Sequence, residues 1–163
     1  MRNIGLVYGG AAVGVMGTLA NAVLAAGGQA IGVIPKSLAV KEVAHDSLNE
    51  LHVVTSMHER KAMMADLADG FIALPGGWGT LEEIFEMLTW AQLGFHDKPC
   101  GLLNTDRYYD GLIGFLENAF DQQFVNELFR PILMTSNDPK SLLDQFMAYQ
   151  APKVRKWMGE EEL

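Results

Sequence analysis

The sequence predicts a doubly wound α/β fold, in which a parallel sheet is flanked by helices on both faces. Short apolar runs rich in Val, Ile and Leu alternate along the chain with longer helix-like segments, and this alternation is typical of parallel α/β sheets. The runs are nearly continuous in apolar residues, as expected for strands buried on both faces. Glycine-rich turns follow two of the runs, at the strand ends where such sheets bind ligands.

The predicted strands are the apolar runs that end at glycine, proline or polar residues. They are residues 4–8, 30–34, 51–54, 71–74, 100–103 and a last short run at 132–134. The predicted helices are residues 13–26, 57–68, 80–93, 108–119 and 139–149, with shorter ones before Asn49 and near Asn126. Ser56 and Asp138 are expected N-caps, because their side-chain oxygens can accept a hydrogen bond from a first-turn amide.

Length and charge limit the classes of protein to consider. The 163 residues predict a single nucleotide-binding α/β domain over residues 1–163, with a charged tail at about 152–163. The net charge of −8 argues against a nucleic-acid partner, because a polyphosphate backbone would be repelled. A small anionic ligand remains compatible with this charge, since oriented backbone dipoles act locally.

Other features of the composition exclude further classes. Cys100 is the only cysteine and lies in an apolar run, so we expect it to be buried and expect no disulfide framework. The histidines lack the spacing of metal ligands, so no metal is expected. No cofactor is expected either. No apolar run reaches the roughly 18 residues that a membrane span needs. With no signal-peptide pattern at the start, these observations predict a cytoplasmic protein without a membrane partner.

The first glycine-rich turn covers residues 8–17 and joins a predicted strand to a predicted helix. Glycines let a phosphate approach backbone amides, and a helix N-terminus attracts negative charge. However, the segment is not G-x-G-x-x-G, and no acidic residue closes the next strand to hold a ribose. A tight strand-to-helix turn, in which the absence of side chains at Gly14 and Gly17 lets the helix pack closely, explains the segment equally well. Both interpretations stay open at this point.

The second glycine-rich turn covers residues 75–83 and is the stronger candidate for a site. It has three glycines in four residues, followed by Thr80, Glu82 and Glu83. Thr80 is expected both to cap the following helix and to offer its hydroxyl to a phosphate. The two carboxylates are expected in the first helical turn, where the helix dipole alone would favour them. A dipole role does not require a glycine loop, so we favour a binding site.

A third segment, residues 56–61, carries Arg60 and Lys61 at the start of a predicted helix. Cations there oppose the helix dipole, and a locally unfavourable choice at a strand end suggests a site. Arg60 could hold a phosphate or carboxylate through two hydrogen bonds. The alternative is a solvated cation pair. His58 is interpreted as a surface or packing residue.

Taken together, these segments resemble the Lonely Guy family of cytokinin riboside 5′-monophosphate phosphoribohydrolases, which are often labelled lysine decarboxylases. The family pattern P-G-G-x-G-T-x-x-E is met by residues 75–83, and the pattern M-H-x-R-K by residues 57–61. Residues 5–10 with Gly14 and Gly17, and residues 89–94, are also similar to the family. The resemblance extends to about Met147. It implies a Rossmann-like fold, a homodimer and a nucleoside 5′-monophosphate substrate.

The resemblance also implies roles for individual residues. Arg60 and Glu83 match the family's catalytic residues: Glu83 would face the ribose, and Arg60 would orient the substrate or assist the leaving base. The implied substrate- and phosphate-binding residues are Gly9, Gly10, Met57, Lys61, Gly76, Gly77, Gly79 and Thr80. The implied products are a free base and ribose 5-phosphate. Whether the base is adenine or a prenylated adenine is not readable from the residues.

One departure from the family concerns the start of the chain. Members usually begin with a strand, a Gly-Ser turn and a helix before the segment that matches residues 4–8, and this sequence lacks that unit. Because the first strand is usually central, its absence is expected to split the sheet and to remove part of the nucleotide site. A misassigned start, a shortened chain and a strand supplied by a partner chain are the explanations considered. We favour an incomplete N-terminus.

Two other functions are considered. A non-catalytic carrier of nucleotide or molybdenum cofactor would need the phosphate loop but no carboxylate facing the ribose. A lysine decarboxylase would need a Schiff-base lysine with pyridoxal phosphate, and the segment around Lys98 matches no such motif. Glu83 together with Arg60 favours the hydrolase.

Overall fold

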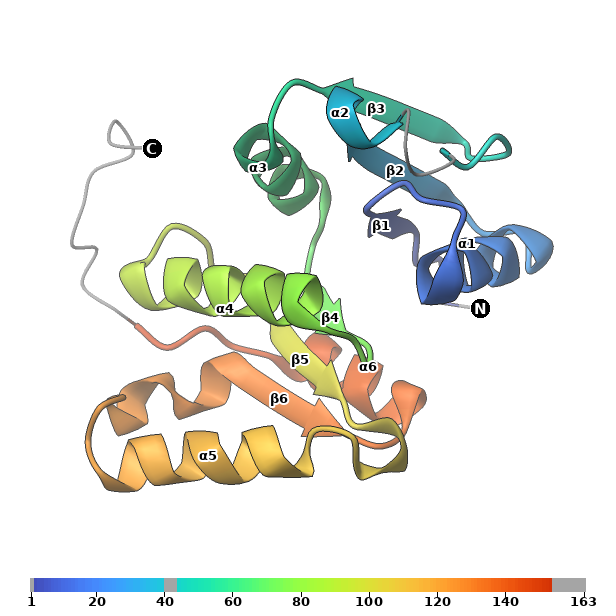
Figure 1. Ribbon diagram of the computed structural model, residues 1–163. Coiled ribbons are helices and arrows are strands. Elements are labelled where there is room, and N and C mark those ends of the chain that lie inside the picture. Colours follow the sequence, from blue (N-terminus) through green and yellow to red (C-terminus); the bar gives the residue numbers. More distant parts are fainter. Residues whose placement is uncertain (1, 40–43, 154–163) are drawn as a thin grey trace. The chain divides into compact units, whose positions relative to one another are not determined.

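The computed structural model describes residues 2–39 and 44–153, and the chain divides into two compact units, Met1–Ala68 and Asp69–Leu163 (Figure 1). Each unit contains a three-stranded parallel sheet with helices packed against it. Most of the predicted charged tail, from residue 154 onward, lies outside the described residues.

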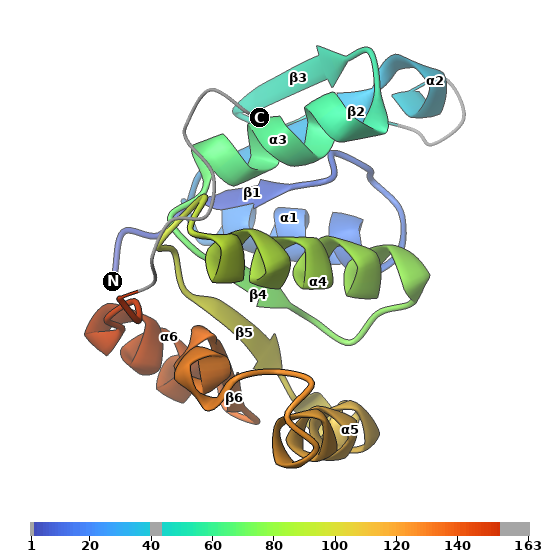
Figure 2. The same ribbon diagram turned by 90° about the vertical axis from the view of Figure 1, so that its left-hand side faces the viewer.

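In the first unit, the sheet has the strand order β1-β2-β3. Its strands are β1 (Leu6–Tyr8), β2 (Ala30–Pro35) and β3 (Glu50–Val54), and its helices are α1 (Gly14–Ala25), α2 (Lys36–Ala39) and α3 (Met57–Leu67). Leu6 pairs with Ala30, and Ile31 pairs with Glu50, in parallel register. Helices α1 and α3 cover opposite faces of this sheet (Figure 2). The side chains of Ala30, Val33 and Ile34 on the central strand are fully buried.

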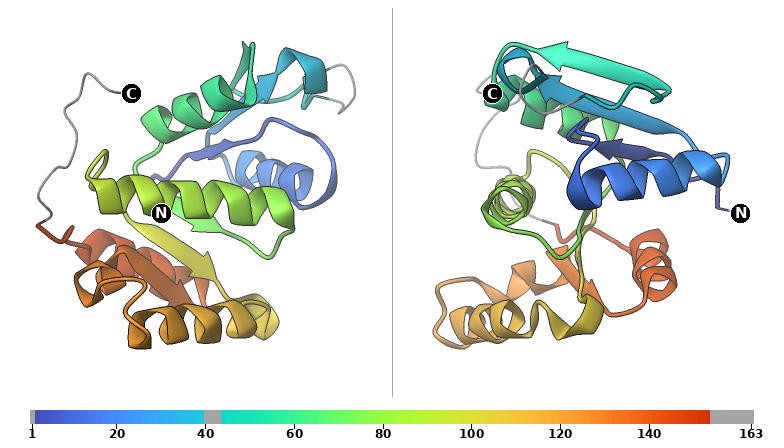
Figure 3. Two further views of the ribbon diagram at one scale, coloured as in Figure 1. Left: turned by 60° about the vertical axis from the view of Figure 1, so that its left-hand side comes forward. Right: turned by 45° about the vertical axis from the view of Figure 1, so that its right-hand side comes forward.

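In the second unit, the sheet has the order β4-β5-β6. Its strands are β4 (Phe71–Ala73), β5 (Cys100–Leu103) and β6 (Leu133–Ser136), and its α-helices are α4 (Trp78–Leu93), α5 (Asp110–Asp121) and α6 (Pro139–Ala148). Two 3₁₀ turns, η1 (Thr105–Arg107) and η2 (Glu127–Ile132), flank α5. Helices α4 and α5 lie on one side of the sheet and α6 on the other (Figure 3, right). Cys100 is fully buried on the central strand, as expected.

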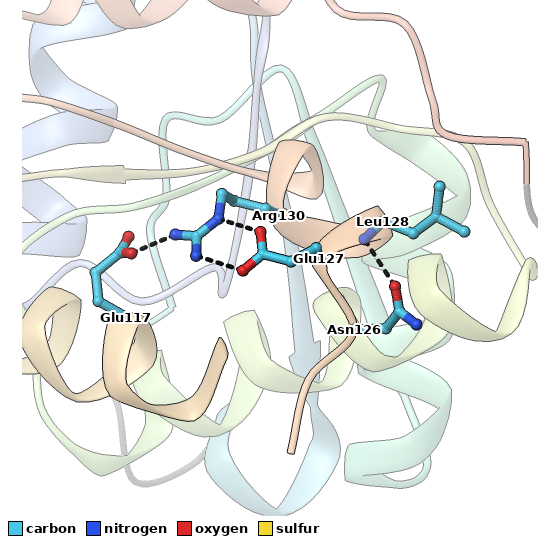
Figure 4. Close-up of polar contacts among 5 residues, drawn as sticks. All are labelled: Glu117, Asn126, Glu127, Leu128 and Arg130. Carbon is cyan, nitrogen blue, oxygen red and sulfur yellow. Dashed lines mark hydrogen bonds and ion pairs between the residues drawn. The ribbon is translucent and has the colours of Figure 1, made fainter. Parts of the chain in front are cut away.

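Ion pairs of Arg130 connect η2 to α5 (Figure 4). Arg130 donates from Nε and Nη2 to the two carboxylate oxygens of Glu127, at 2.7 and 2.8 Å, and from Nη1 to Glu117 on α5. Its guanidinium also lies 4.3 Å from the ring centroid of Phe120. The side chain of Asn126 caps η2 by accepting from the amide of Leu128.

The predicted parallel α/β architecture is confirmed, and the strands of the described residues form two three-stranded sheets. Within the described residues, β1 and β4 are each an edge strand of their own sheet. The predicted caps are also confirmed: Ser56 accepts from the amide of Glu59, and Asp138 from that of Ser141. None of the helices in the described ranges is both long and apolar enough to cross a bilayer.

Two predicted helix starts are wrong. Helix α4 begins at Trp78 with Gly77 as its N-cap, so Thr80 lies inside the first turn and does not cap it. Because glycine is a poor helix former, the helix was predicted to begin only after Gly79. Helix α5 begins at Asp110, two residues later than predicted, because η1 and the left-handed conformations of Asp106 and Arg107 precede it.

Candidate active site

The glycines that follow β1 are explained largely by packing inside the first unit. Gly10 has a φ of +77°, which favours glycine, and a Cβ there would lie 3.2 Å from Cβ of Ile34. A Cβ on Gly9 would overlap the guanidinium of Arg60. A Cβ on Gly17 would overlap the backbone of Ala12, and Gly14 has a φ of +61°. Close packing and positive φ angles therefore account for these glycines, and the role of the turn toward a phosphate stays a prediction.

The start of α3 holds two buried cations. Arg60 is 9% exposed and Lys61 is 7% exposed, so the interpretation of a solvated cation pair is wrong. Arg60 donates from Nε to the carbonyl of Val33 on β2, at 3.1 Å. With Gly9 against its Nη2, the guanidinium is fixed at the carboxyl ends of β1 and β2. Met57 and His58, at the same helix start, are exposed.

The α3 N-terminus is stabilised by a set of hydrogen bonds around Glu59. The Glu59 carboxylate accepts from the amide and the hydroxyl of Thr55, at 2.7 and 2.6 Å, while its own amide donates to Ser56. These hydrogen bonds lower the pKa of Glu59 below its ordinary value. The helix therefore starts at a defined residue, and this fixes the positions of Arg60 and Lys61.

In the second unit, the glycine loop leads from β4 into α4. A Cβ on Gly76 would overlap the side chain of Thr80, so the packing inside the loop requires glycine there. A Cβ on Gly77 or Gly79 would meet no atom within 4 Å among the described residues. Both residues are exposed, and neither has a positive φ. Packing within the described part of the chain therefore does not explain these two glycines.

The two carboxylates after the loop differ in environment. Because α4 starts at Trp78, Glu82 and Glu83 lie beyond its first turn, and the prediction that they lie within it is wrong. Stabilisation of a negative charge by the helix dipole falls off within the first turn. The dipole therefore explains the two carboxylates less well than the sequence suggested. Glu82 is exposed, whereas Glu83 is half-buried. Glu83 is therefore the better candidate for a ligand-facing carboxylate.

Sequence reasoning missed two tyrosines beside the loop. Tyr109 donates its hydroxyl to the carbonyl of Leu74, and Tyr108 donates to the carbonyl of Gly76, both at 2.6 Å. They follow β5, the neighbour of β4 in the sheet. Because turns after adjacent parallel strands lie side by side, the order of the strands was the signal that could have identified them.

A third tyrosine lies next to the first glycine turn. Tyr8, at the end of β1, is 6% exposed, and its hydroxyl has no hydrogen-bond partner in the described part of the chain. Burial raises its pKa. A buried hydroxyl that makes no hydrogen bond is unfavourable by about 1–3 kcal/mol.

The predicted site residues fall into two groups. Gly9, Gly10, Met57, Arg60 and Lys61 belong to the first unit, and Arg60 contacts Gly9 directly. The second unit contains the loop with Gly76, Gly77, Gly79, Thr80 and Glu83. The pairing of Arg60 with Glu83 stays a prediction. Among the described residues, no group of three His, Cys, Asp or Glu side chains could hold a metal ion.

Comparison with known proteins identifies the family. A family model described as "Possible lysine decarboxylase" matches residues 16–146. A cytokinin riboside 5′-monophosphate phosphoribohydrolase from Rhodococcoides fascians is 56% identical over 134 residues, which cover 82% of this chain and 68% of that protein. The chain belongs to the Lonely Guy family.

Plant members of the Lonely Guy family are similar over more of the chain. A cytokinin riboside 5′-monophosphate phosphoribohydrolase from Arabidopsis thaliana is 48% identical over 149 residues, covering 91% of this chain and 69% of that protein. A relative from Oryza sativa subsp. japonica, named "Probable cytokinin riboside 5′-monophosphate phosphoribohydrolase", is 50% identical over 148 residues. That match covers 91% of this chain and 59% of the relative. The chain thus spans between about three fifths and 70% of the length of these relatives.

Proposed function

We propose that this protein hydrolyses the N-glycosidic bond of a nucleoside 5′-monophosphate, either a cytokinin riboside 5′-monophosphate or AMP. The observation that carries the proposal is the start of α4. There, two glycines that packing among the described residues does not require precede a half-buried carboxylate. The names of the Lonely Guy relatives, which are phosphoribohydrolases, support the same reaction.

The loop suits a phosphate group. Gly77, the N-cap of α4, has no side chain with which to cap the helix, and the first amides of a helix have no partner within the helix. Together with the helix dipole, such amides bind anions. Because Gly77 and Gly79 have no Cβ, a phosphate can come close to the backbone here. The Thr80 hydroxyl, in the same turn, can donate a further hydrogen bond.

The reaction replaces the bond between C1′ of the ribose and the base nitrogen with a bond from C1′ to a water oxygen. The base leaves with the bonding electrons and takes up a proton, and ribose 5-phosphate is the second product. The ribose gains positive charge in the transition state. The Glu83 carboxylate would stabilise this charge or orient the attacking water. The Arg60 guanidinium stays protonated, so it would orient the substrate or assist the departing base electrostatically.

The direct test compares two neighbouring carboxylates. We expect Glu83→Gln to lower kcat for release of adenine from AMP by about 100-fold or more, because the amide carries no charge. We expect Glu82→Gln, the matched control on an exposed side chain of the same helix, to keep wild-type activity. Release of free base and ribose 5-phosphate is followed by chromatography for AMP and for a prenylated substrate. Equal activity of wild type and Glu83→Gln would contradict the proposed role.

A non-catalytic carrier of nucleotide or molybdenum cofactor is the alternative outcome. Tight binding of AMP without release of base by the wild-type protein would support it. The lysine decarboxylase activity in the family model's description is a third outcome. That chemistry would be revealed by an absorbance band from bound pyridoxal phosphate in the purified protein and by release of CO₂ from lysine.

Two further proposals concern the oligomeric state of the protein and its location in the cell. We propose a homodimer that acts in the cytoplasm. Large aromatic side chains on the surface of the second unit support self-association: Phe115 is 64% exposed and Phe124 is 88% exposed. Exposed apolar groups of this size are candidates for a protein interface.

A further inference from the structure

The side chains of two consecutive tyrosines, Tyr108 and Tyr109, hydrogen-bond to the backbone that follows β4. The Tyr109 hydroxyl donates to the carbonyl of Leu74 and the Tyr108 hydroxyl to that of Gly76, each at 2.6 Å. These carbonyls flank Pro75, which has no N–H of its own to donate. Gly76 and Gly77, which follow, have the largest conformational freedom of any residue type. A segment of this composition needs external contacts to keep one conformation.

The two tyrosines are themselves held in place. Their rings make an edge-to-face contact with centroids 4.9 Å apart, and Tyr109 is 1% exposed. The Tyr109 amide donates to the side chain of Asn104 at 2.7 Å, and Asn104 donates to Asp110 at 2.8 Å. Burial raises the pKa of Tyr109, so its phenol stays a hydrogen-bond donor over the physiological range.

The turn that presents the tyrosines has an unfavourable backbone conformation. Asp106 and Arg107 both have left-handed backbones, with φ of 50° and 63°. Non-glycine residues adopt this region at an energetic cost, and such residues cluster at functional sites. The Asn104–Asp110 hydrogen bond and the Arg107–Asp110 ion pair, at 2.8 and 2.6 Å, hold the turn in this form.

The contacts converge on one peptide of the glycine loop. Gly76 packs its Cα against the side chain of Thr80, while its carbonyl accepts from Tyr108. The amides next along the chain are those of Gly77, Trp78 and Gly79. We infer that Tyr108 and Tyr109 are positioning residues that hold the glycine loop in the conformation that binds the substrate's phosphate. This inference rests on the proposed function.

The test uses Tyr108→Phe, because Tyr108 is 56% exposed and the variant keeps the ring while losing one hydrogen bond. We expect amide hydrogen exchange to accelerate at residues 76–80. We also expect affinity for AMP and for ribose 5-phosphate to fall about 2- to 10-fold, in line with the loss of one hydrogen bond. Affinity for adenine, which has no phosphate, should stay the same. In turnover, KM should rise more than kcat falls.

Tyr149→Phe is the matched control, since Tyr149 follows α6 and lies near Cys100 at the opposite end of β5. It should leave loop exchange and phosphate affinity at the wild-type level. Tyr109→Phe should reproduce the Tyr108→Phe effects with a larger loss of stability, because Tyr109 is buried.

Two separate measurements distinguish the possible failures. Unchanged exchange at residues 76–80 in Tyr108→Phe would overturn the inference, as would equal losses of affinity for adenine and for ribose 5-phosphate. Wild-type protein that binds neither AMP nor ribose 5-phosphate would instead count against the proposed function, whatever the exchange measurement shows.

Discussion

Gly76 and Gly79 belong to one loop but are glycine for different reasons. A Cβ on Gly76 would overlap the Thr80 side chain, whereas a Cβ on Gly79 would meet no atom within 4 Å among the described residues. The first glycine is needed for the loop to fold. The second has no such explanation in the described part of the chain, and the approach of a ligand is the reason that we propose for it.

Substitution by alanine separates these two reasons. We expect Gly76→Ala to lower the free energy of unfolding by about 1–3 kcal/mol, because the added methyl must displace Thr80. Gly79→Ala, in the first turn of α4, should leave stability unchanged or raise it by up to about 1 kcal/mol, since alanine favours helix. It should nevertheless weaken AMP binding. Denaturant unfolding and calorimetric titration measure the two effects, and Gly79→Ala with wild-type AMP affinity would contradict the phosphate-loop proposal.

The roles of single residues were only partly predictable. The glycines, Thr80, Glu83, Arg60 and Lys61 stand out in the sequence because of their local pattern. The burial of Arg60 was not predictable from its local pattern, because the guanidinium lies against Gly9, in the turn after β1, and donates to the carbonyl of Val33 on β2. Tyr108 and Tyr109 were missed because they act on a loop more than 30 residues away in the chain, through contacts that no local pattern reveals.

At the scale of elements, the connection from α4 to β5 depends on His96. Its Nε2 donates to the carbonyl of Met87 at 3.0 Å, and its Nδ1 accepts from the amide of Lys98 at 3.1 Å. This arrangement needs a neutral ring, because a second ring proton would face the Lys98 donor. Burial, the main cause, lowers the pKa of His96 below its ordinary value of 6.5.

The lowered pKa predicts how stability depends on pH. As pH falls below about 6.5, the unfolded chain takes up a proton at His96 before the folded protein does. The stabilisation is therefore complete above that pH and is lost progressively as pH falls toward and through the lower folded pKa. We expect the melting temperature to decrease on acidification from pH 7.5 to 5.

Two variants isolate the contribution of this histidine. His96→Gln should melt lower at pH 7.5 and should show a smaller decrease on acidification than the wild-type protein. His58→Gln, which changes an exposed histidine, should keep the wild-type pH profile. An identical pH dependence in His96→Gln and the wild-type protein would contradict this role.

Helix boundaries show where local patterns were sufficient. Ser56 and Asp138 cap their helices as predicted, because capping depends on residues within one turn. The start of α4 was misplaced because the glycine loop before it is stabilised by Tyr108, from elsewhere in the chain. The start of α5 was misplaced because Asp106 and Arg107 adopt left-handed backbones that their residue types do not predict. Local propensity therefore failed at the two segments that we assign to the candidate site.

At the scale of the whole molecule, short apolar runs predicted each strand of the described residues within a few residues, and their alternation with helices predicted parallel pairing. The sequence pattern does not determine which strand pairs with which, because pairing joins segments far apart in the chain. In the described residues, the six strands form two sheets with β1 and β4 at their edges. Unpaired edge strands present backbone donors and acceptors that a further strand can pair with.

The proposed homodimer can be tested on the intact chain. We expect sedimentation equilibrium to give a mass of twice 17.9 kDa, because exposed aromatic side chains such as Phe124 favour a protein contact over water. If Phe124 lies in the dimer interface, Phe124→Ser should shift the sedimentation equilibrium toward the monomer. A wild-type mass of 17.9 kDa across micromolar concentrations would contradict the dimer.

The buried cysteine has a practical consequence for measuring motion in the second unit. Cys100 is the only cysteine in the sequence, it is fully buried on the central strand β5, and burial raises its pKa to about 12. An alkylating reagent can reach this sulfur only when β5 becomes exposed. The rate of alkylation therefore reports how often the sheet beneath the glycine loop opens, and it does so at a single native atom without an engineered label.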